Sequence, residues 1–212
     1  WMLARSAAFN AGYSFVTSYE ALENNGFTDQ ILSAIGRWEQ ARMADVFTSD
    51  QKSRMEDVGA EFELLGSGPE DWELVQVYPQ IFRHERGARQ PGEPLHSAFD
   101  FDNPGAEQTL EWIVSAEDGA VGDIEITIEG GPSVLMLVTL AEGWSVRYTG
   151  GESATVRDAE NRAVREIAIP EAAFQISPGR HSVRVNARLE PEDEAKARLE
   201  LRPRGAVEAL GR

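Results

Sequence analysis

The sequence predicts an α+β fold in which a short N-terminal helical segment precedes an antiparallel, jelly-roll-like β-sandwich. In residues 1–60, apolar side chains recur at steps of three and four residues, the spacing of amphipathic helices. After Glu61, short runs alternate apolar and polar residues, and Gly, Pro and Asn separate the runs. Short strands without helices between them are typical of sandwiches and jelly rolls. We therefore expect a helical segment over residues 1–60 and a sandwich domain over residues 61–212, with residues 61–94 as connecting strands and loop.

The first predicted helix begins near Leu3 and ends at the Asn-Asn-Gly of residues 24–26, a sequence that commonly terminates helices. Its apolar positions have helical spacing and are Leu3, Ala7, Ala8, Ala11, Phe15, Tyr19 and Leu22. No charged residue occurs between Ser6 and Tyr19. A helix this apolar needs cover on more than one side, and we expect that the chain itself does not supply it.

The same stretch has the pattern of neither a signal peptide nor a membrane span. Both need a continuous apolar core, and a span needs about 20 mostly apolar residues. Polar or small residues interrupt the stretch at Ser6, Asn10, Gly12, Ser14 and Thr17. We therefore expect a soluble protein.

Two further helices are predicted before the β-rich part. The second covers residues 29–46, with Thr28 as its N-cap. Thr48 and Gln51 have the spacing of a capping box, which predicts a third, short helix over residues 49–58. No strand is expected between the helices.

Most runs in the β-rich part alternate apolar and polar residues, which indicates strands with one buried face. The predicted strands are FELL, WELVQVYP, SAFDF, TLEWIVS, DIEITIE, VLMLVTL, WSVRY, ATVRD, REIAI, HSVRVNARL and KARLELR. The run VLMLVTL is apolar throughout, which favours a central strand. The Gly- and Pro-rich stretch IFRHERGARQPGEP, from Ile81 to Pro94, is interpreted as a polar loop.

The charge balance limits the possible partners. The chain has 36 acidic and 20 basic residues and a formal net charge of −16. Nucleic acids and anionic membranes bind basic surfaces, so we expect neither as a partner. The chain has no cysteine, which excludes disulfides and thiolate metal sites. Because it also lacks a phosphate loop, a dinucleotide fingerprint, a serine-hydrolase elbow and an H-E-x-x-H motif, we predict no cofactor and no catalytic residue.

Two sets of runs resemble the C-terminal part of a bacterial (β/α)₈-barrel glycoside hydrolase. ARSAAFNAGYSFV and ILSAIGRWEQARMADVFTSDQKSRM, with the pattern I..WE.AR, are similar to the closing helices of such barrels. GWSVRYTGG, ATVRDAENRAV and ARLELRPRG look like the β-sandwich that follows them. The likeness spans most of the chain and does not identify a family within the glycosidases.

The resemblance implies a carbohydrate-active parent protein of bacterial origin, with a periplasmic or secreted location favoured. Its catalytic carboxylates would lie outside this chain, at the ends of barrel strands. The implied partners are a polysaccharide or oligosaccharide and an N-terminal catalytic domain of the same polypeptide, and the sandwich would stabilise that domain or contact glycan. The alternative arrangement packs the helices on one face of the sandwich. The alternative function is a non-catalytic interaction module of a bacterial surface or envelope protein.

Five residues are candidates for carbohydrate contact. Sugar rings stack on exposed aromatic side chains, and polar neighbours orient their hydroxyls. Trp144 and Tyr148 lie four residues apart around a short strand and share a face, and Trp72 flanks an earlier strand. Arg83 and His84 lie in the predicted polar loop, where the alternative is a solvated connector held by weak ion pairs.

Three acidic residues are weak candidates for calcium ligands. Asp100 and Asp102 offer the hard oxygens that calcium prefers, as does Asp158 in RDAENR. Asp100 and Asp102 also alternate with Phe99 and Phe101, so the preferred explanation is that both face solvent from a strand. A hairpin turn explains Asp158.

Overall fold

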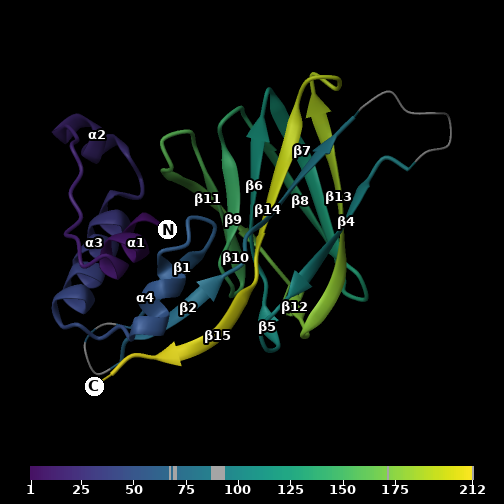
Figure 1. Ribbon diagram of the computed structural model, residues 1–212. Coiled ribbons are helices and arrows are strands. Elements are labelled where there is room, and N and C mark those ends of the chain that lie inside the picture. The colour runs from purple at the N-terminus through teal and green to yellow at the C-terminus, as the bar shows by residue number, and fades with distance from the viewer. Residues whose placement is uncertain (67, 69–70, 87–93, 171, 212) are drawn as a thin grey trace. The chain divides into compact units, whose positions relative to one another are not determined.

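The computed structural model describes residues 1–66, 68, 71–86, 94–170 and 172–211 (Figure 1). Antiparallel sheets dominate and a few helices precede them, which confirms a β-rich α+β fold. The chain forms two compact units. We call Trp1–Tyr78 with Arg204–Arg212 the helix–sheet unit, and Pro79–Pro203 the β unit.

The boundary between these units differs from the predicted boundary at residue 60. β1 (Glu61–Leu65), β2 (Glu73–Val77) and β15 (Arg204–Ala209) form a three-stranded sheet that belongs to the helix–sheet unit. β15 was not predicted. It pairs with β2, so the end of the chain completes a sheet that begins at residue 61.

The predicted first helix is two separate helices, α1 (Met2–Ala8) and α2 (Tyr19–Asn24). Asn10 ends the first, with a φ of 50° in the left-handed region that Asn tolerates. Ser18 caps the second, because its hydroxyl oxygen accepts a hydrogen bond from the Ala21 N–H at 3.1 Å. The prediction of one helix was wrong because its polar and small residues favour caps and turns over a helix interior.

The other two helices lie close to their predicted positions. α3 covers Thr28–Met43 and α4 covers Ser49–Met55. The capping box is confirmed: the Gln51 N–H donates to Thr48 Oγ1 at 3.2 Å, and the Thr48 N–H donates to Gln51 Oε1 at 2.9 Å. Thr28 begins α3, and it is Phe27 that occupies the N-cap position.

The buried face of α1 is covered within the helix–sheet unit, contrary to expectation. Ala4, Ala7 and Ala8 are buried, and α1 contacts α3, α4 and β1. The small side chains allow this close approach. The remaining buried apolar residues of this core are Trp38, Ala41, Phe47, Met55, Phe62, Leu64, Trp72, Leu74 and Leu210.

The β unit contains two larger antiparallel sheets and a two-stranded pair (Figure 1). The six-stranded sheet has the order β11 (Ala163–Ala168), β10 (Ser153–Arg157), β9 (Ser145–Tyr148), β6 (Glu111–Glu117), β14 (Lys196–Arg202) and β3 (Gln80–Glu85). The four-stranded sheet has the order β4 (Ser97–Asn103), β13 (Gly179–Glu190), β7 (Ala120–Ile128) and β8 (Ser133–Leu140). β12 (Gln175–Ile176) pairs with β5 (Gln108–Thr109).

One hydrophobic core receives side chains from both larger sheets. The six-stranded sheet contributes Trp112, Val114, Val146, Val156 and Leu199, and the four-stranded sheet contributes Ile124, Ile126, Met136, Val183 and Val185. Inward residues alternate with outward ones along each strand, so the opposite face of the four-stranded sheet remains accessible.

Two strand predictions were wrong. VLMLVTL forms β8 at the edge of its sheet, where Leu135 and Leu137 are exposed and alternate with buried residues. β3 occupies Gln80–Glu85 in the stretch predicted as a loop, and pairs with β14. The rest of that predicted loop at 87–93, and with it part of the predicted connector 61–94, lies outside the described residues.

A hydrogen-bonded ion pair joins α4 to β15 and predicts acid sensitivity of the helix–sheet unit. Arg54 Nη2 donates to Glu208 Oε2 at 2.6 Å, and Gln51 Nε2 donates to the same oxygen at 3.1 Å. The hydrogen bond from Arg54 lowers the pKa of Glu208, against a smaller opposing effect of burial. A lowered pKa stabilises the fold above the unfolded-state pKa, and this contribution disappears as pH falls through the folded-state pKa.

We therefore expect Glu208→Gln to lower the free energy of unfolding by about 1 kcal/mol at pH 7. The loss should be this small because the ion pair is partly exposed. The difference from the wild type should shrink as pH falls below about 4.3, the unfolded-state pKa of Glu, and vanish once pH is below the lowered folded-state pKa of Glu208. Asp50→Asn is the matched control, because Asp50 pairs with the same Arg54 but its side chain is 83% exposed. Urea unfolding of the wild type and both variants, at pH 7 and at a series of acidic pH values, measures these free energies of unfolding. Equal stability of Glu208→Gln and the wild type at pH 7 would contradict it.

Candidate functional site

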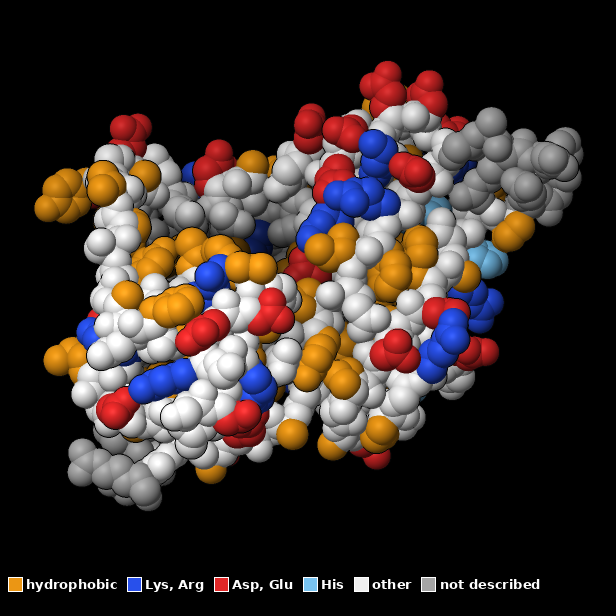
Figure 2. All heavy atoms as spheres, in the orientation of Figure 1, with side chains coloured by type: hydrophobic (Ala, Val, Ile, Leu, Met, Phe, Trp, Pro, Cys, Tyr) orange, Lys and Arg blue, Asp and Glu red, His pale blue; other side chains and the backbone are white. Residues whose placement is uncertain are grey.

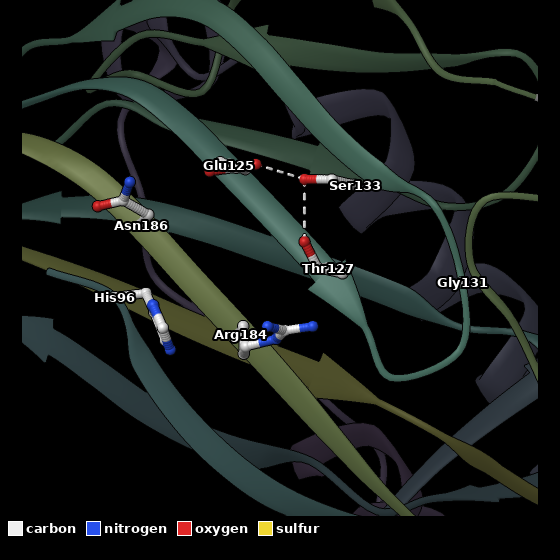
Figure 3. Close-up of a pocket in the computed structure, with 7 residues that line it drawn as sticks. All are labelled: His96, Glu125, Thr127, Gly131, Ser133, Arg184 and Asn186. Atoms are coloured by element: carbon white, nitrogen blue, oxygen red, sulfur yellow. Dashed lines mark hydrogen bonds between the residues drawn. The ribbon is translucent and has the colours of Figure 1, made fainter. Parts of the chain in front are cut away.

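A polar hollow of about 340 Å³ lies on the outer face of the four-stranded sheet (Figure 3). Its described lining residues are His96, Glu125, Thr127, Gly131, Ser133, Arg184 and Asn186. Figure 3 shows His96 on one side of β13, and Glu125 and Thr127 of β7 on the other. All of these residues belong to the β unit.

Strand alternation places these side chains on the outer face. Val183 and Val185 of β13 are fully buried, so Arg184 and Asn186 between and after them point outward. On β7, Ile126 is fully buried and its neighbours Glu125 and Thr127 are only partly buried. The hydrophobic core thus determines which polar groups face the solvent.

The register brings the outward residues into two cross-strand rows. Arg184 lies opposite Thr127, which lies opposite Ser133 on β8. Asn186 lies opposite Glu125, which lies opposite the exposed Leu135. Directly opposite residues have Cβ atoms about 4.5–5.5 Å apart, so each row is continuous across the sheet.

The β7–β8 turn borders the hollow. Gly130 has a φ of 81°, a conformation that glycine adopts without steric cost, and Gly131 lines the hollow beside it. The tight turn brings Ser133 back beside Thr127.

A chain of hydrogen bonds fixes three groups in the hollow. Thr127 Oγ1 donates to Ser133 Oγ at 2.9 Å, and Ser133 Oγ donates to Glu125 Oε1 at 2.5 Å (Figure 3). Within the described chain, the second carboxylate oxygen of Glu125 accepts no hydrogen bond. It is therefore available to a ligand that donates one.

The opposite side of the hollow carries polar groups without partners. Among the described residues, neither the Arg184 nor the Asn186 side chain forms a hydrogen bond or ion pair, and the His96 ring forms none either. Every other described Arg or Lys side chain contacts an acidic group, a carbonyl, a hydroxyl or a ring, or interacts electrostatically with another group. A guanidinium without an acidic partner, such as that of Arg184, is unusual in a chain with a net charge of −16.

These groups can bind a polar ligand, but the described lining does not provide the pair of carboxyl groups that glycoside hydrolysis uses. The hollow provides donors from Arg184 and Asn186 and an acceptor from Glu125. Glycoside hydrolysis uses two carboxyl groups across the scissile bond. The described lining residues contain one carboxylate, Glu125. Binding is therefore the chemistry that the arrangement supports.

The predicted aromatic pair lies in or against the core. Tyr148 is 3% exposed, and Trp144 is partly buried against the same cluster. Trp112 stacks on Tyr148 with ring centroids 5.6 Å apart, and the Tyr148 hydroxyl donates to the Gly151 carbonyl at 3.0 Å. Burial also raises the pKa of Tyr148. The two residues share a face as predicted, but that face is the inner one, so they form no exposed stacking surface.

Two of the three other carbohydrate candidates are buried. Trp72 is 1% exposed in the core of the helix–sheet unit. His84 is fully buried on β3, where its Nδ1 lies 2.9 Å from Ser97 Oγ. Arg83 is exposed on β3 and donates to Glu117 at 2.8 Å. Arg83 and His84 are neighbours on β3 but one is exposed and the other buried, and Trp72 belongs to the other unit.

The calcium candidates have other partners. Asp100 pairs with Arg180 at 2.5 Å, and the Asp102 backbone bonds to the Gln80 side chain. Asp158 pairs with Arg162 and also accepts its backbone N–H at 2.8 Å, as in a turn. Within the described ranges, no group of three or more His, Cys, Asp or Glu side chains is placed to hold a metal ion.

Comparisons with known proteins give no relative. No family model, curated protein or solved structure matches this chain. Among the described residues, no helix combines the length and apolar character needed to cross a membrane.

Sequence reasoning missed the residues of the hollow. The signal was present in HSVRVNARL and DIEITIE, where Arg184, Asn186, Glu125 and Thr127 alternate with apolar residues. Alternation identifies an outward face but not the strand opposite. The pairing of β13 with β7 brings the two runs together, and they are more than fifty residues apart in the sequence.

The burial of Trp112 and Trp144 predicts how much stability each loses when it is changed to Ala. Trp112 is fully buried, so Trp112→Ala should lower the free energy of unfolding by roughly 3–5 kcal/mol. Trp144 is only partly buried, so Trp144→Ala should lower it by about 1–3 kcal/mol. Urea unfolding measures both values. A Trp144→Ala variant of unchanged stability that loses retention on a polysaccharide gel would instead place Trp144 in a binding surface.

Proposed function

We propose that this chain is a non-catalytic region of a carbohydrate-active protein of the glycoside hydrolase type, and that its β unit binds glycan. The observation that carries the proposal is the hollow on the four-stranded sheet, where Arg184 and Asn186 have no partner among the described residues. Unsatisfied side-chain donors beside a fixed acceptor suit a ligand rich in hydroxyls.

The β unit would act as a β-sandwich in this role. Two antiparallel sheets contribute to one core, which supports a sandwich arrangement, and the four-stranded sheet has an accessible outer face. A rigid sheet is a precise platform for binding groups, because packing restricts the backbone beneath them.

The rim of the hollow supports a sugar ligand in particular. Sugars present hydroxyl edges and apolar C–H faces. Leu135, 56% exposed, follows Glu125 in its cross-strand row and offers apolar surface next to the polar groups. This places hydrogen-bonding and apolar contacts side by side on one face.

Catalysis, in this proposal, belongs to a domain outside the chain. The resemblance of the helical runs to the closing helices of a barrel hydrolase supports this division, as does the single carboxylate in the described lining. The β unit would hold the glycan or stabilise the catalytic domain.

Affinity electrophoresis of the 212-residue chain against a panel of neutral and acidic polysaccharides tests glycan binding. We expect retardation by at least one member of the panel, and Asn186→Ala should weaken it at least fivefold because it removes hydrogen bonds to the ligand. Ser182→Ala is the control, since Ser182 lies on β13 outside the hollow. Melting temperatures should remain within about 2 °C for both, because neither side chain is in the core.

Retardation by no polysaccharide would contradict the proposal. Equal loss of retardation in Asn186→Ala and Ser182→Ala would also contradict it, because the effect would not be specific to the hollow.

A second function, a protein-interaction module of a surface or envelope protein, is favoured by a different observation. Phe15 and Val16 between α1 and α2, and Tyr19 at the start of α2, have exposed side chains, and Val16 is fully exposed. Figure 2 shows several exposed hydrophobic side chains on the helix–sheet unit. Large exposed apolar patches commonly mark protein contacts.

A photo-reactive amino acid at position 16, activated in the producing cell, tests this second function. One dominant cross-linked protein, absent when the same group replaces the exposed Leu137 of β8, would support it. No cross-link to any protein would contradict it.

A further inference from the structure

We propose that the hollow selects sugar units that carry a carboxylate, and that Arg184 binds this carboxylate. The inference rests on the proposed glycan binding and deepens it by naming the ligand class, uronic acid residues. It depends on the charges and free hydrogen-bonding groups of the hollow.

Arg184 provides the anion-binding group. It is exposed on β13, and within the described chain its guanidinium has neither a carboxylate partner nor a hydrogen bond. The arginines before and after it on the same face, Arg180 and Arg188, are both paired with acidic side chains. A guanidinium presents parallel N–H groups that match the two oxygens of a carboxylate.

The rest of the hollow requires hydroxyl groups from the same ligand. Glu125 lies on the neighbouring strand with one oxygen held by Ser133 and the other without a described donor. Since a carboxylate only accepts hydrogen bonds, a ligand group near it must donate. A sugar hydroxyl does so, and another anionic group would be repelled.

Asn186 links the two requirements. It lies on the same strand face as Arg184 and directly opposite Glu125, and its amide has no described partner. An amide both donates and accepts, so it can bond a hydroxyl between the anionic and neutral parts of the ligand. The hollow therefore combines a cationic end with a hydroxyl-binding end.

This asymmetry favours a carboxylate over a sulfate or phosphate ester. A planar carboxylate matches the guanidinium and leaves the sugar hydroxyls free for Glu125 and Asn186. A ligand with several sulfate groups would bring negative charge to Glu125 as well. A neutral sugar would leave the charge of Arg184 without a partner.

Isothermal titration calorimetry with matched ligands tests the inference. The probes are oligosaccharides of galacturonate, glucuronate and mannuronate, each compared with its methyl ester, which keeps the sugar and removes the charge. Neutral and sulfated oligosaccharides complete the set. At least one free acid should bind tenfold or more tightly than its ester, and added salt should reduce the difference.

Variants of Arg184 test whether its guanidinium causes the preference for the free acid over its methyl ester. Arg184→Gln should remove the preference of the acid over the ester, and Arg184→Lys should retain part of it because the charge remains without the planar fork. Arg180→Gln is the matched control, because it removes the same charge from the same strand face outside the hollow. It should keep the preference, with a melting temperature close to that of the wild type.

Equal binding of acids and esters, or an unchanged preference in Arg184→Gln, would overturn the inference while glycan binding stands. Tighter binding of sulfated than of carboxylated sugars would also overturn it. Binding of no oligosaccharide in the set, neutral ones included, would overturn it together with the proposed function.

Discussion

The antiparallel pairing of β13 with β7 is the constraint on which the candidate site depends. It places Asn186 opposite Glu125 and Arg184 opposite Thr127. Strand side chains alternate with a period of two, so a slip of one residue would turn Arg184 into the core and Val185 into solvent. Burying a guanidinium without a partner costs several kcal/mol, and exposing the valine loses a further contribution. The hydrophobic core therefore selects the register that builds the hollow.

The same core makes the outer face a stable platform. Beneath the hollow, Val183, Val185, Ile124 and Ile126 are all fully buried in a cluster shared with the six-stranded sheet. Rigid packing below limits the movement of the groups above, while the hydrogen-bond chain through Ser133 holds Glu125 in place. Arg184 is then the arginine in this face whose charge the described chain does not neutralise.

Local signals predicted local structure well. The capping box at Thr48 and nearly all of the alternating strands follow from a few neighbouring residues. Properties set by distant contacts were not predictable: β15 is a strand because β2 offers a pairing edge, and Tyr148 is buried because Trp112 and Phe174 surround it. The hollow belongs to this second group, since its rows come from three strands whose order the sequence does not show.

The claim that the hollow on the four-stranded sheet binds glycan is tested most directly by NMR. The backbone amide and arginine side-chain signals are followed while the best-binding glycan is added. We expect the largest chemical-shift changes at residues 125–127, 133 and 184–186, with the Arg184 Nε–H among them. Shifts that concentrate instead around Trp144, or on α1 and α2, would contradict it.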